Sequence, residues 1–190
     1  MNRVCIVGGA GTGKTTLSEN LGRELNLPVY HLDGFNYFPN WKERDKKERN
    51  ELILKAAKKK KWVIDGNYRE TLQDRLDKAD LVIFLDYSLY TQITGVLKRY
   101  FRGRKKEKEE IPGCKERISK EFISWIIKWR KTGRLDIIKM INSLKNKEVF
   151  IFKSRKELNK WYKDKFSKDV TSIINITNSY GKCEFSIIFR

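Results

Sequence analysis

Residues 8–15, with the sequence GGAGTGKT, have the residue types and spacing of a loop that holds the phosphates of a nucleoside triphosphate. Glycines let backbone N–H groups curl around phosphate oxygens, and the start of a following helix adds the positive end of its dipole. Lys14 is expected to neutralise the β- and γ-phosphates, and the Thr15 hydroxyl to ligate Mg²⁺. The residues expected to bind the nucleotide, ATP or GTP, are Gly8, Gly9, Ala10, Gly11, Thr12, Gly13, Lys14, Thr15 and Thr16. The alternatives are a glycine turn with an incidental lysine, and a loop that binds nucleotide without catalysis.

The segments on either side of this loop are those that would position it. Residues 3–7 form a β-branched run without polar alternation, which is typical of a strand buried on both faces. After the loop, Leu17, Leu21 and Leu25 recur every four residues, which predicts one apolar face of a helix. Further strands are expected at residues 28–33, 62–65, 81–85 and 149–152, and helices at 42–60, 89–102, 118–131, 135–144 and 156–166. Strands alternating with helices predict an α/β fold with a five-stranded parallel sheet flanked by helices.

Charge is the most unusual feature of the composition. The 190 residues include 42 lysines and arginines against 24 aspartates and glutamates, a net charge of +18. Residues 96–134 alone hold 14 basic and five acidic side chains. Such a charge attracts phosphorylated small molecules or polyanions such as nucleic acid, and the alternative is a lysine-rich, solvated surface.

Length and cysteine content set the broad class of protein. At 190 residues we expect one compact domain with an appendage, as a monomer or a homodimer. The three cysteines are far apart and odd in number, which argues against a zinc cage or a disulfide framework and favours a reducing cytoplasm. No apolar run approaches the roughly 20 residues of a membrane span, and the N-terminus lacks a signal-peptide core.

Several short motifs resemble a known family. Residues 65–69, DGNYR, have the spacing of the Asp-Gly-Phe-Pro-Arg segment of adenylate kinases, with Tyr68 in place of the proline. The fuller set resembles the adenylate-kinase-like group of DNA topology modulation proteins: HLD at 31–33, Phe38-Pro39-x-Trp41-x-x-Arg44, VIDGNY at 63–68, IFLDY at 83–87 and KRY at 98–100.

This resemblance covers roughly residues 1–166 and implies a P-loop NTPase fold like that of nucleoside monophosphate kinases. A helical, arginine-rich lid is expected at about residues 99–134. Residues 167–190 form a C-terminal extension of unknown role, within which residues 172–176 and 185–189 could pair as a hairpin. The segment between the second and third strands is too short and too charged to match the usual acceptor domain, so the acceptor stays open.

Two carboxylates are expected at the ligand-binding edge of the sheet, because parallel sheets gather ligands at the carboxyl ends of their strands. The apolar run before it predicts that Asp33 closes the second strand. By the resemblance, Asp33 orients an acceptor hydroxyl or holds Mg²⁺ through water. A helix or turn cap is the alternative. Asp65, after the apolar pair Val63-Ile64, is the better candidate for the Mg²⁺ water shell. His31, the only histidine, is expected to be a packed or capping residue rather than a base.

The remaining candidates are arginines whose roles come from the resemblance. Arg69 is expected to contact a phosphate or hydroxyl-bearing group of the acceptor, with a surface salt bridge to Glu70 or Asp74 as the alternative. The arginines expected to close over the triphosphate are Arg99, Arg102 and Arg104, with Arg130 and Arg134 returning from the far side of the lid. At least one of the first three is expected to be catalytic, and the alternative is that all five are solvated surface charges.

Three functions fit these features. The first is an ATP-dependent kinase that transfers the γ-phosphate of Mg-ATP to a nucleoside, a nucleotide or a similar polar metabolite. The second is a nucleic-acid-associated P-loop NTPase that modulates DNA topology, whose affinity for nucleic acid should fall steeply with salt. The third is a nucleotide-sensing protein without turnover. The stripe formed by Phe122, Trp125, Ile126 and Trp129 is assigned to the core rather than to base stacking.

Overall fold

The structure is a computed structural model that describes residues 1–103, 107–108 and 110–166. The chain divides into two compact units, Met1–Ser154 and Arg155–Arg190. Arg104 and the expected hairpin of the C-terminal extension lie outside the described residues. In the described part of the chain, every helix is too short or too polar to cross a membrane.

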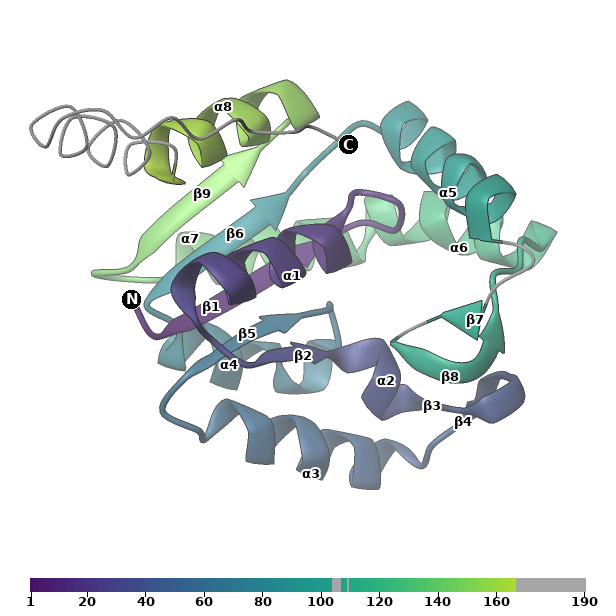
Figure 1. The fold of residues 1–190 in the computed structure, drawn as a ribbon, viewed down its shortest axis with the longest axis horizontal. Helices are drawn as coiled ribbons and strands as arrows, with labels where there is room; N and C mark the ends of the chain where they lie inside the picture. The colour runs from purple at the N-terminus through teal and green to yellow at the C-terminus, as the bar shows by residue number, and fades with distance from the viewer. Residues whose placement is uncertain (104–106, 109, 167–190) are drawn as a thin grey trace, which may run out of the picture. The chain divides into compact units, whose positions relative to one another are not determined.

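A five-stranded parallel sheet runs through the first unit (Figure 1). Its strands are β1 (Arg3–Gly8), β2 (Val29–His31), β5 (Trp62–Asp65), β6 (Leu81–Leu85) and β9 (Glu148–Phe152). The order across the sheet is β2-β5-β1-β6-β9, and each neighbouring pair is parallel. The carboxyl ends of β2, β5 and β1 therefore lie at one edge, where the residues that follow them in sequence come together.

Helices cover both faces of this sheet. The helices of the first unit are α1 (Lys14–Leu25), α2 (Leu32–Asn36), α3 (Lys46–Ala57), α4 (Leu72–Lys78), α5 (Leu89–Gly103), α6 (Lys120–Lys131) and α7 (Gly133–Asn142). Helix α1 lies in front of the sheet, while α4 and α7 lie behind it (Figure 1). Helix α3 begins at a capped end, because the Asp45 carboxylate accepts hydrogen bonds from the backbone N–H groups of Lys47 and Glu48.

The main apolar core lies on the face away from α1. Alternate strand residues point into it, and they are Cys5 and Val7 of β1, Trp62 and Ile64 of β5, and Val82 and Phe84 of β6. They pack against side chains of α3, α4, α6 and α7. Within the predicted aromatic stripe, Ile126 and Trp129 are buried, whereas Trp125 is 47% exposed. The stripe is therefore core on one side only.

Two small antiparallel pairs of strands and the short helix α2 were not among the elements expected from the sequence. Strands β3 (Tyr37–Phe38) and β4 (Lys42–Glu43) flank the 3₁₀ turn η1 (Pro39–Trp41). Strands β7 (Glu107–Lys108) and β8 (Ile111–Lys115) form a ribbon between α5 and α6, so the expected lid is not helical throughout. The expectation that Asp33 closes a strand is wrong, because β2 ends at His31 and Asp33 lies in the first turn of α2.

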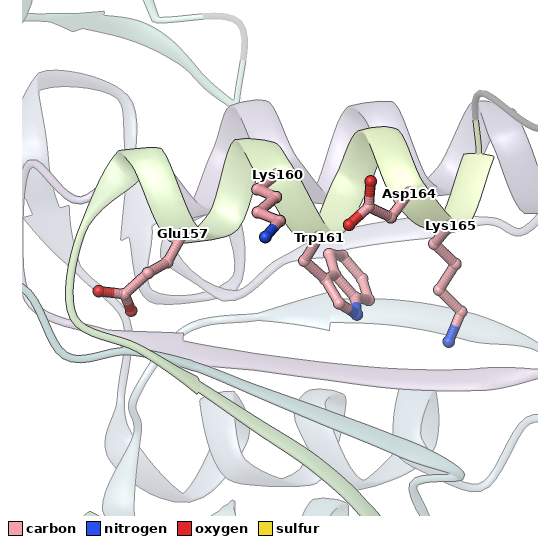
Figure 2. Close-up of a pocket in the computed structure, with 5 residues that line it drawn as sticks. All are labelled: Glu157, Lys160, Trp161, Asp164 and Lys165. Carbon is pink, nitrogen blue, oxygen red and sulfur yellow. The ribbon is translucent and has the colours of Figure 1, made fainter.

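The second unit is described through one helix, α8 (Arg155–Phe166). Figure 2 shows five of its side chains on one face of the helix: Glu157, Lys160, Trp161, Asp164 and Lys165. Their spacing of three and four residues is that of a single helical face. This face mixes charged groups with one aromatic ring and holds none of the expected site residues.

Candidate functional site

The glycine loop connects the end of β1 to the first residue of α1. Gly11 and Gly13 have positive φ angles of 70° and 91°, which side-chain-bearing residues rarely adopt. A Cβ atom on Gly11 would lie 2.3 Å from the backbone oxygen of Gln92 and 2.7 Å from the backbone nitrogen of Val96. The loop can therefore pack this closely on α5 only with glycine at position 11.

The start of α1 is open for an anion. Gly13 occupies the N-cap position and, among the described residues, no side chain caps this helix end. The first backbone N–H groups of a helix lack intrahelical partners and carry the positive end of the dipole. Lys14 lies directly beside them, so the loop combines backbone donors with a cation in the way phosphate binding requires.

The Lys14 side chain folds back onto the loop. Its ammonium donates hydrogen bonds to the carbonyl oxygens of Gly8 at 3.0 Å and Gly9 at 2.9 Å. The Thr12 hydroxyl also donates to the Gly9 carbonyl, at 2.8 Å. Burial lowers the pKa of Lys14, and the charges of Asp65 and Asp33 act in the opposite direction. An arriving phosphate oxygen would replace neutral carbonyls with a charged partner, which strengthens the hydrogen bonds of the ammonium.

Asn67 joins the loop after β5 to the phosphate loop, a role that the sequence analysis missed. Its amide nitrogen donates to the Gly8 carbonyl at 2.9 Å, and its amide oxygen accepts from the Gly8 N–H at 3.0 Å. This two-way pairing imitates a strand partner for the last residue of β1. The signal available in the sequence was the position of Asn67 within the DGNYR segment, next to a strand end.

Asp65 lies at the carboxyl end of β5 against the first turns of α1. Its buried carboxylate accepts hydrogen bonds from the Ser18 hydroxyl at 2.5 Å and from His31 Nδ1 at 2.6 Å. The Ser18 hydroxyl also contacts the Thr15 carbonyl oxygen at 2.8 Å. The Asp65 carboxylate and the Thr15 backbone therefore contact the same serine, and a carboxylate and a threonine hydroxyl are both oxygen ligands of the type that Mg²⁺ prefers.

A metal ion at this place would depend on its substrate for further ligands. Among the described residues, no group of three or more histidine, cysteine, aspartate or glutamate side chains could hold a metal ion. Mg²⁺ in nucleotide sites usually takes one or two protein oxygens and completes its shell with phosphate oxygens and water. The Thr15 and Asp65 oxygens fit Mg²⁺ that arrives with a nucleotide.

His31 bridges two carboxylates. Its Nδ1 contacts Asp65 and its Nε2 contacts Glu19 Oε1 at 2.7 Å, so the ring is packed and paired and does not cap α2. Burial disfavours the charged ring, but the hydrogen bond and charge of Asp65, together with Glu19, outweigh it and raise the pKa of His31 to about 9. The imidazolium at neutral pH ties the start of α2 to α1 and β5.

The free energy of unfolding is expected to fall as the pH rises toward 9. Because folding raises the pKa of His31 above 6.5, the stabilisation is fully present below pH 6.5 and is lost as the pH passes about 9. With allowance for solvent screening, the expected loss is about 1–2 kcal/mol. Urea unfolding of the wild type and of His31→Gln, from pH 6 to pH 10, measures it. A wild-type curve parallel to that of His31→Gln would contradict this assignment.

Asp33 is exposed at the start of α2, and Tyr68 orients it. The Tyr68 hydroxyl donates to Asp33 Oδ1 at 3.0 Å. Burial and the charge of Asp33 both raise the pKa of Tyr68, so the phenol keeps its proton and donates it to the carboxylate. Tyr68, which departs from the adenylate kinase pattern, therefore contacts the Asp33 carboxylate. The charge of Asp33 in turn acts on Lys14.

Arg69 pairs with a partner that the sequence analysis did not consider. Its guanidinium contacts Asp136 of α7 at 2.9 Å, rather than Glu70 or Asp74, and its side chain is 70% exposed. Exposed pairs of this kind contribute about 0–1 kcal/mol, so a ligand can displace the pairing at little cost.

The expected lid arginines lie in different environments. Arg99 Nε contacts Glu116 Oε1 at 2.8 Å, and the charge of Arg99 acts on Lys14. Arg102 is exposed near the end of α5. The charge of Arg99, an expected lid arginine, thus acts on the lysine of the phosphate loop.

Arg130 and Arg134 contact the chain just after β6. Arg130 donates to the Tyr87 carbonyl at 2.7 Å, and Arg134 makes a two-pronged contact with Asp86 at 2.5 and 2.8 Å. Burial opposes ionisation of Asp86, but Arg134 and Lys153 outweigh it and hold its pKa below the usual range. These two arginines anchor α6 and α7 to the sheet edge.

Comparisons with known proteins extend this description. The sequence profile of the ATPase family associated with various cellular activities (AAA) matches residues 4–86. Shikimate kinase from Acinetobacter baumannii, solved with shikimate, has a similar structure with a TM-score of 0.58 and 14% identity, over 88% of this chain and 94% of that chain. A gluconokinase from Sinorhizobium meliloti 1021 has a TM-score of 0.51 and 11% identity, over 95% of this chain and 98% of that chain. A search of the curated proteins finds no match.

These likenesses concern the fold. The profile match runs from β1 to the residue after β6 and includes the glycine loop. The structural matches extend over most of both chains, at identities that leave the substrate open. The expected fold class is confirmed: a five-stranded parallel sheet flanked by helices, with the P-loop architecture that small-molecule kinases share.

Proposed function

We propose that the protein is an ATP-dependent small-molecule kinase that transfers the γ-phosphate of Mg-ATP to a hydroxyl or phosphate oxygen of a nucleoside, a nucleotide or a similar polar metabolite. The observation that carries this proposal is the geometry of the glycine loop. The start of α1 has no side-chain cap, the Lys14 ammonium lies on the loop beside it, and Ser18 of the same helix holds the buried Asp65 carboxylate. The charges of Asp65, Asp33 and Arg99, the residues assigned to the metal, the acceptor and the lid of a phosphoryl-transfer site, also act on the pKa of Lys14.

The proposed reaction needs positioning more than covalent chemistry. An acceptor oxygen forms a bond to the γ-phosphorus while the bond from that phosphorus to the β–γ bridging oxygen breaks, and its electron pair stays on ADP. The Asp33 carboxylate accepts the proton of an acceptor hydroxyl and later releases it to water. Tyr68 holds Asp33 in place through its 3.0 Å hydrogen bond.

The remaining assignments neutralise the charge of the phosphates. Lys14 and the backbone N–H groups of residues 8–16 bind the β- and γ-phosphates, and Arg99 stabilises the charge that spreads over the transferred group. Mg²⁺, held by Thr15 and through water by Asp65, supplies further neutralisation when bound. Arg69 leaves Asp136 to contact the acceptor, and Arg102 and Arg104 close over the triphosphate.

We further propose that residues 1–166 form the kinase-like domain, with a lid at about 99–134 and an extension at 167–190. The motifs at 31–33, 63–68 and 83–87 support membership of the adenylate-kinase-like group of DNA topology modulation proteins. Membership of this group would not identify the phosphate acceptor, because the name of the group describes an effect on DNA and not a substrate.

The test is γ-phosphate transfer from Mg-ATP to a pooled panel of nucleosides, nucleoside monophosphates and sugar-like alcohols, read by mass. A phosphorylated product that requires intact Lys14 is the expected result and would name the acceptor class. Consumption of ATP without any phosphorylated acceptor would contradict the kinase and favour an NTPase. The net charge of +18 makes stimulation by DNA or RNA the next measurement in that case.

A further inference from the structure

Lys108 of the β7–β8 ribbon is a buried lysine that the sequence analysis did not single out. Its side chain is only 9% exposed, and its ammonium lies 3.5 Å from Glu116 Oε1. The same oxygen contacts Arg99 at 2.8 Å, and the Glu116 side chain is 8% exposed. One carboxylate therefore holds two cations from two different elements, α5 and the ribbon.

The ribbon that carries Lys108 is fastened to the segment between β3 and β4. The Trp41 indole N–H donates to the Lys115 carbonyl at 3.1 Å, and the Trp41 backbone N–H contacts Cys114 Sγ at 3.2 Å. Lys108 lies 5.4 Å from the centre of the Trp41 ring. Asn40 and Trp41 both have left-handed backbone angles, φ 61° and 62°, a strained arrangement that such contacts must maintain. Glu116 and Trp41 thus hold Lys108 in position from two sides.

Lys108 and Arg99 also lie near the phosphate loop. Gly11 of the loop packs on Gln92 and Val96 of α5, about one turn before Arg99 on the same helix, and Lys108 shares the Glu116 carboxylate with Arg99. The charges of both cations also act on Lys14, in the direction that lowers its pKa. Lys14, Arg99 and Lys108 together carry three positive charges, while Glu116 contributes one negative charge through direct contact. Like charges held close together repel one another unless an anion joins them, and the repulsion is strongest where a cation is removed from water, as Lys108 is. The polyanion that fits beside Lys14 is the terminal phosphate of a nucleoside triphosphate.

We propose that Lys108 is a further catalytic residue that binds the γ-phosphate, and that Glu116 positions it together with Arg99. This inference rests on the proposed function for the identity of the ligand. It adds a cation that belongs to the ribbon and not to the arginine-rich helix. A lysine acts here as a compact point charge that needs no planar partner, which suits a place shared with two other cations.

Binding of Mg-ATP and Mg-ADP to the full chain, measured by isothermal titration, tests this role. Lys108→Met keeps an unbranched side chain against Trp41 and removes the charge. We expect it to weaken Mg-ATP binding by about 10- to 100-fold, because a hydrogen bond to a charged group is lost, and to change Mg-ADP binding by less than about 3-fold. Lys108→Arg should recover most of the loss. The matched control is Lys115→Met, an exposed lysine of the same ribbon.

The positioning role of Glu116 is tested by the ratio of Mg-ATP affinity to Mg-ADP affinity. Glu116→Ala should reduce this ratio, and Glu116→Asp should restore it in part, which a purely structural carboxylate would not do. Thermal unfolding of each variant shows that it is folded.

Several results would overturn the proposal while leaving the kinase intact. One is that Lys108→Met weakens the binding of Mg-ATP and Mg-ADP equally, and another is that it weakens neither. A third is that Lys108→Arg loses as much Mg-ATP affinity as Lys108→Met. A wild-type protein that binds neither nucleotide would instead overturn the proposed function itself.

Discussion

Lys14→Met is expected to reduce phosphoryl transfer by about 100- to 1,000-fold, the loss seen when one preorganised donor to a developing charge is removed. The reason is that the Gly8 and Gly9 carbonyls hold Lys14 at the start of α1, where we propose that its ammonium binds the β- and γ-phosphates. Burial lowers its pKa, so the ammonium is already partly stripped of water and gains strongly from a phosphate partner.

The measurement is a comparison of rate and of Mg-ATP affinity in wild type, Lys14→Met and Lys55→Met. Lys55 is an exposed lysine of α3, so its replacement changes the net charge equally without touching the loop. All three proteins should have similar midpoint temperatures of thermal unfolding, since the hydrogen bonds of Lys14 to its own loop are partly exposed. A Lys14→Met protein that transfers phosphate at the wild-type rate would remove the basis of the proposed function.

Arg75→Met is expected to lower the free energy of unfolding by about 3–5 kcal/mol, the range for breaking a buried charged network. Arg75 is fully buried in α4. Its guanidinium donates to the backbone carbonyls of Gly66 at 2.8 Å, Tyr68 at 3.0 Å, Thr71 at 3.3 Å and Asn67 at 3.4 Å. Methionine fills much of the same volume but removes the guanidinium donors from these carbonyls, which is the costly part of the change. Of the four, the Tyr68 carbonyl keeps other donors, the backbone N–H and the hydroxyl of Thr71.

Urea unfolding measures this loss, with Arg23→Met as the control. Arg23 is exposed on α1 and its guanidinium donates a hydrogen bond to the nearby Asn20 side chain, so its replacement should cost less than about 0.5 kcal/mol. Because the carbonyls of residues 66–68 belong to the loop that carries Asn67 and Tyr68, Arg75→Met should also weaken nucleotide binding. A loss of stability below about 1 kcal/mol would mean that the loop does not depend on the guanidinium.

The parts of the fold predicted best are those whose burial is visible in the sequence. Strands β5 and β6 were predicted with the bounds that the structure has, because every residue of β6 is apolar and β5 joins three apolar residues to Asp65. The glycine loop was equally clear, since backbone conformation there requires glycine at spaced positions. Fold class followed from these elements, because alternating buried strands and amphipathic helices pack in few ways.

Elements that depend on distant partners were missed. The ribbon strand β7 has only two residues and pairs with β8, and β8 packs on Pro39 and Trp41 some 70 residues earlier in the chain. Neither strand shows a local apolar pattern. The end of β2 was misplaced for a related reason: Leu32 is buried whether it ends a strand or begins a helix, so its burial could not separate Asp33 in a strand from Asp33 in α2.

The sequence by itself determined the phosphate loop, the parallel sheet and the candidate residues Lys14 and Asp65, because each depends on residue type and local spacing. Only the tertiary structure decided which charges meet. It paired Arg69 with Asp136, joined His31 to Asp65 and Glu19, and placed Arg99 and Lys108 on one carboxylate, Glu116. Electrostatic partners are selected by distance and burial across the folded chain, and neither quantity is encoded in the order of residues around any one of them.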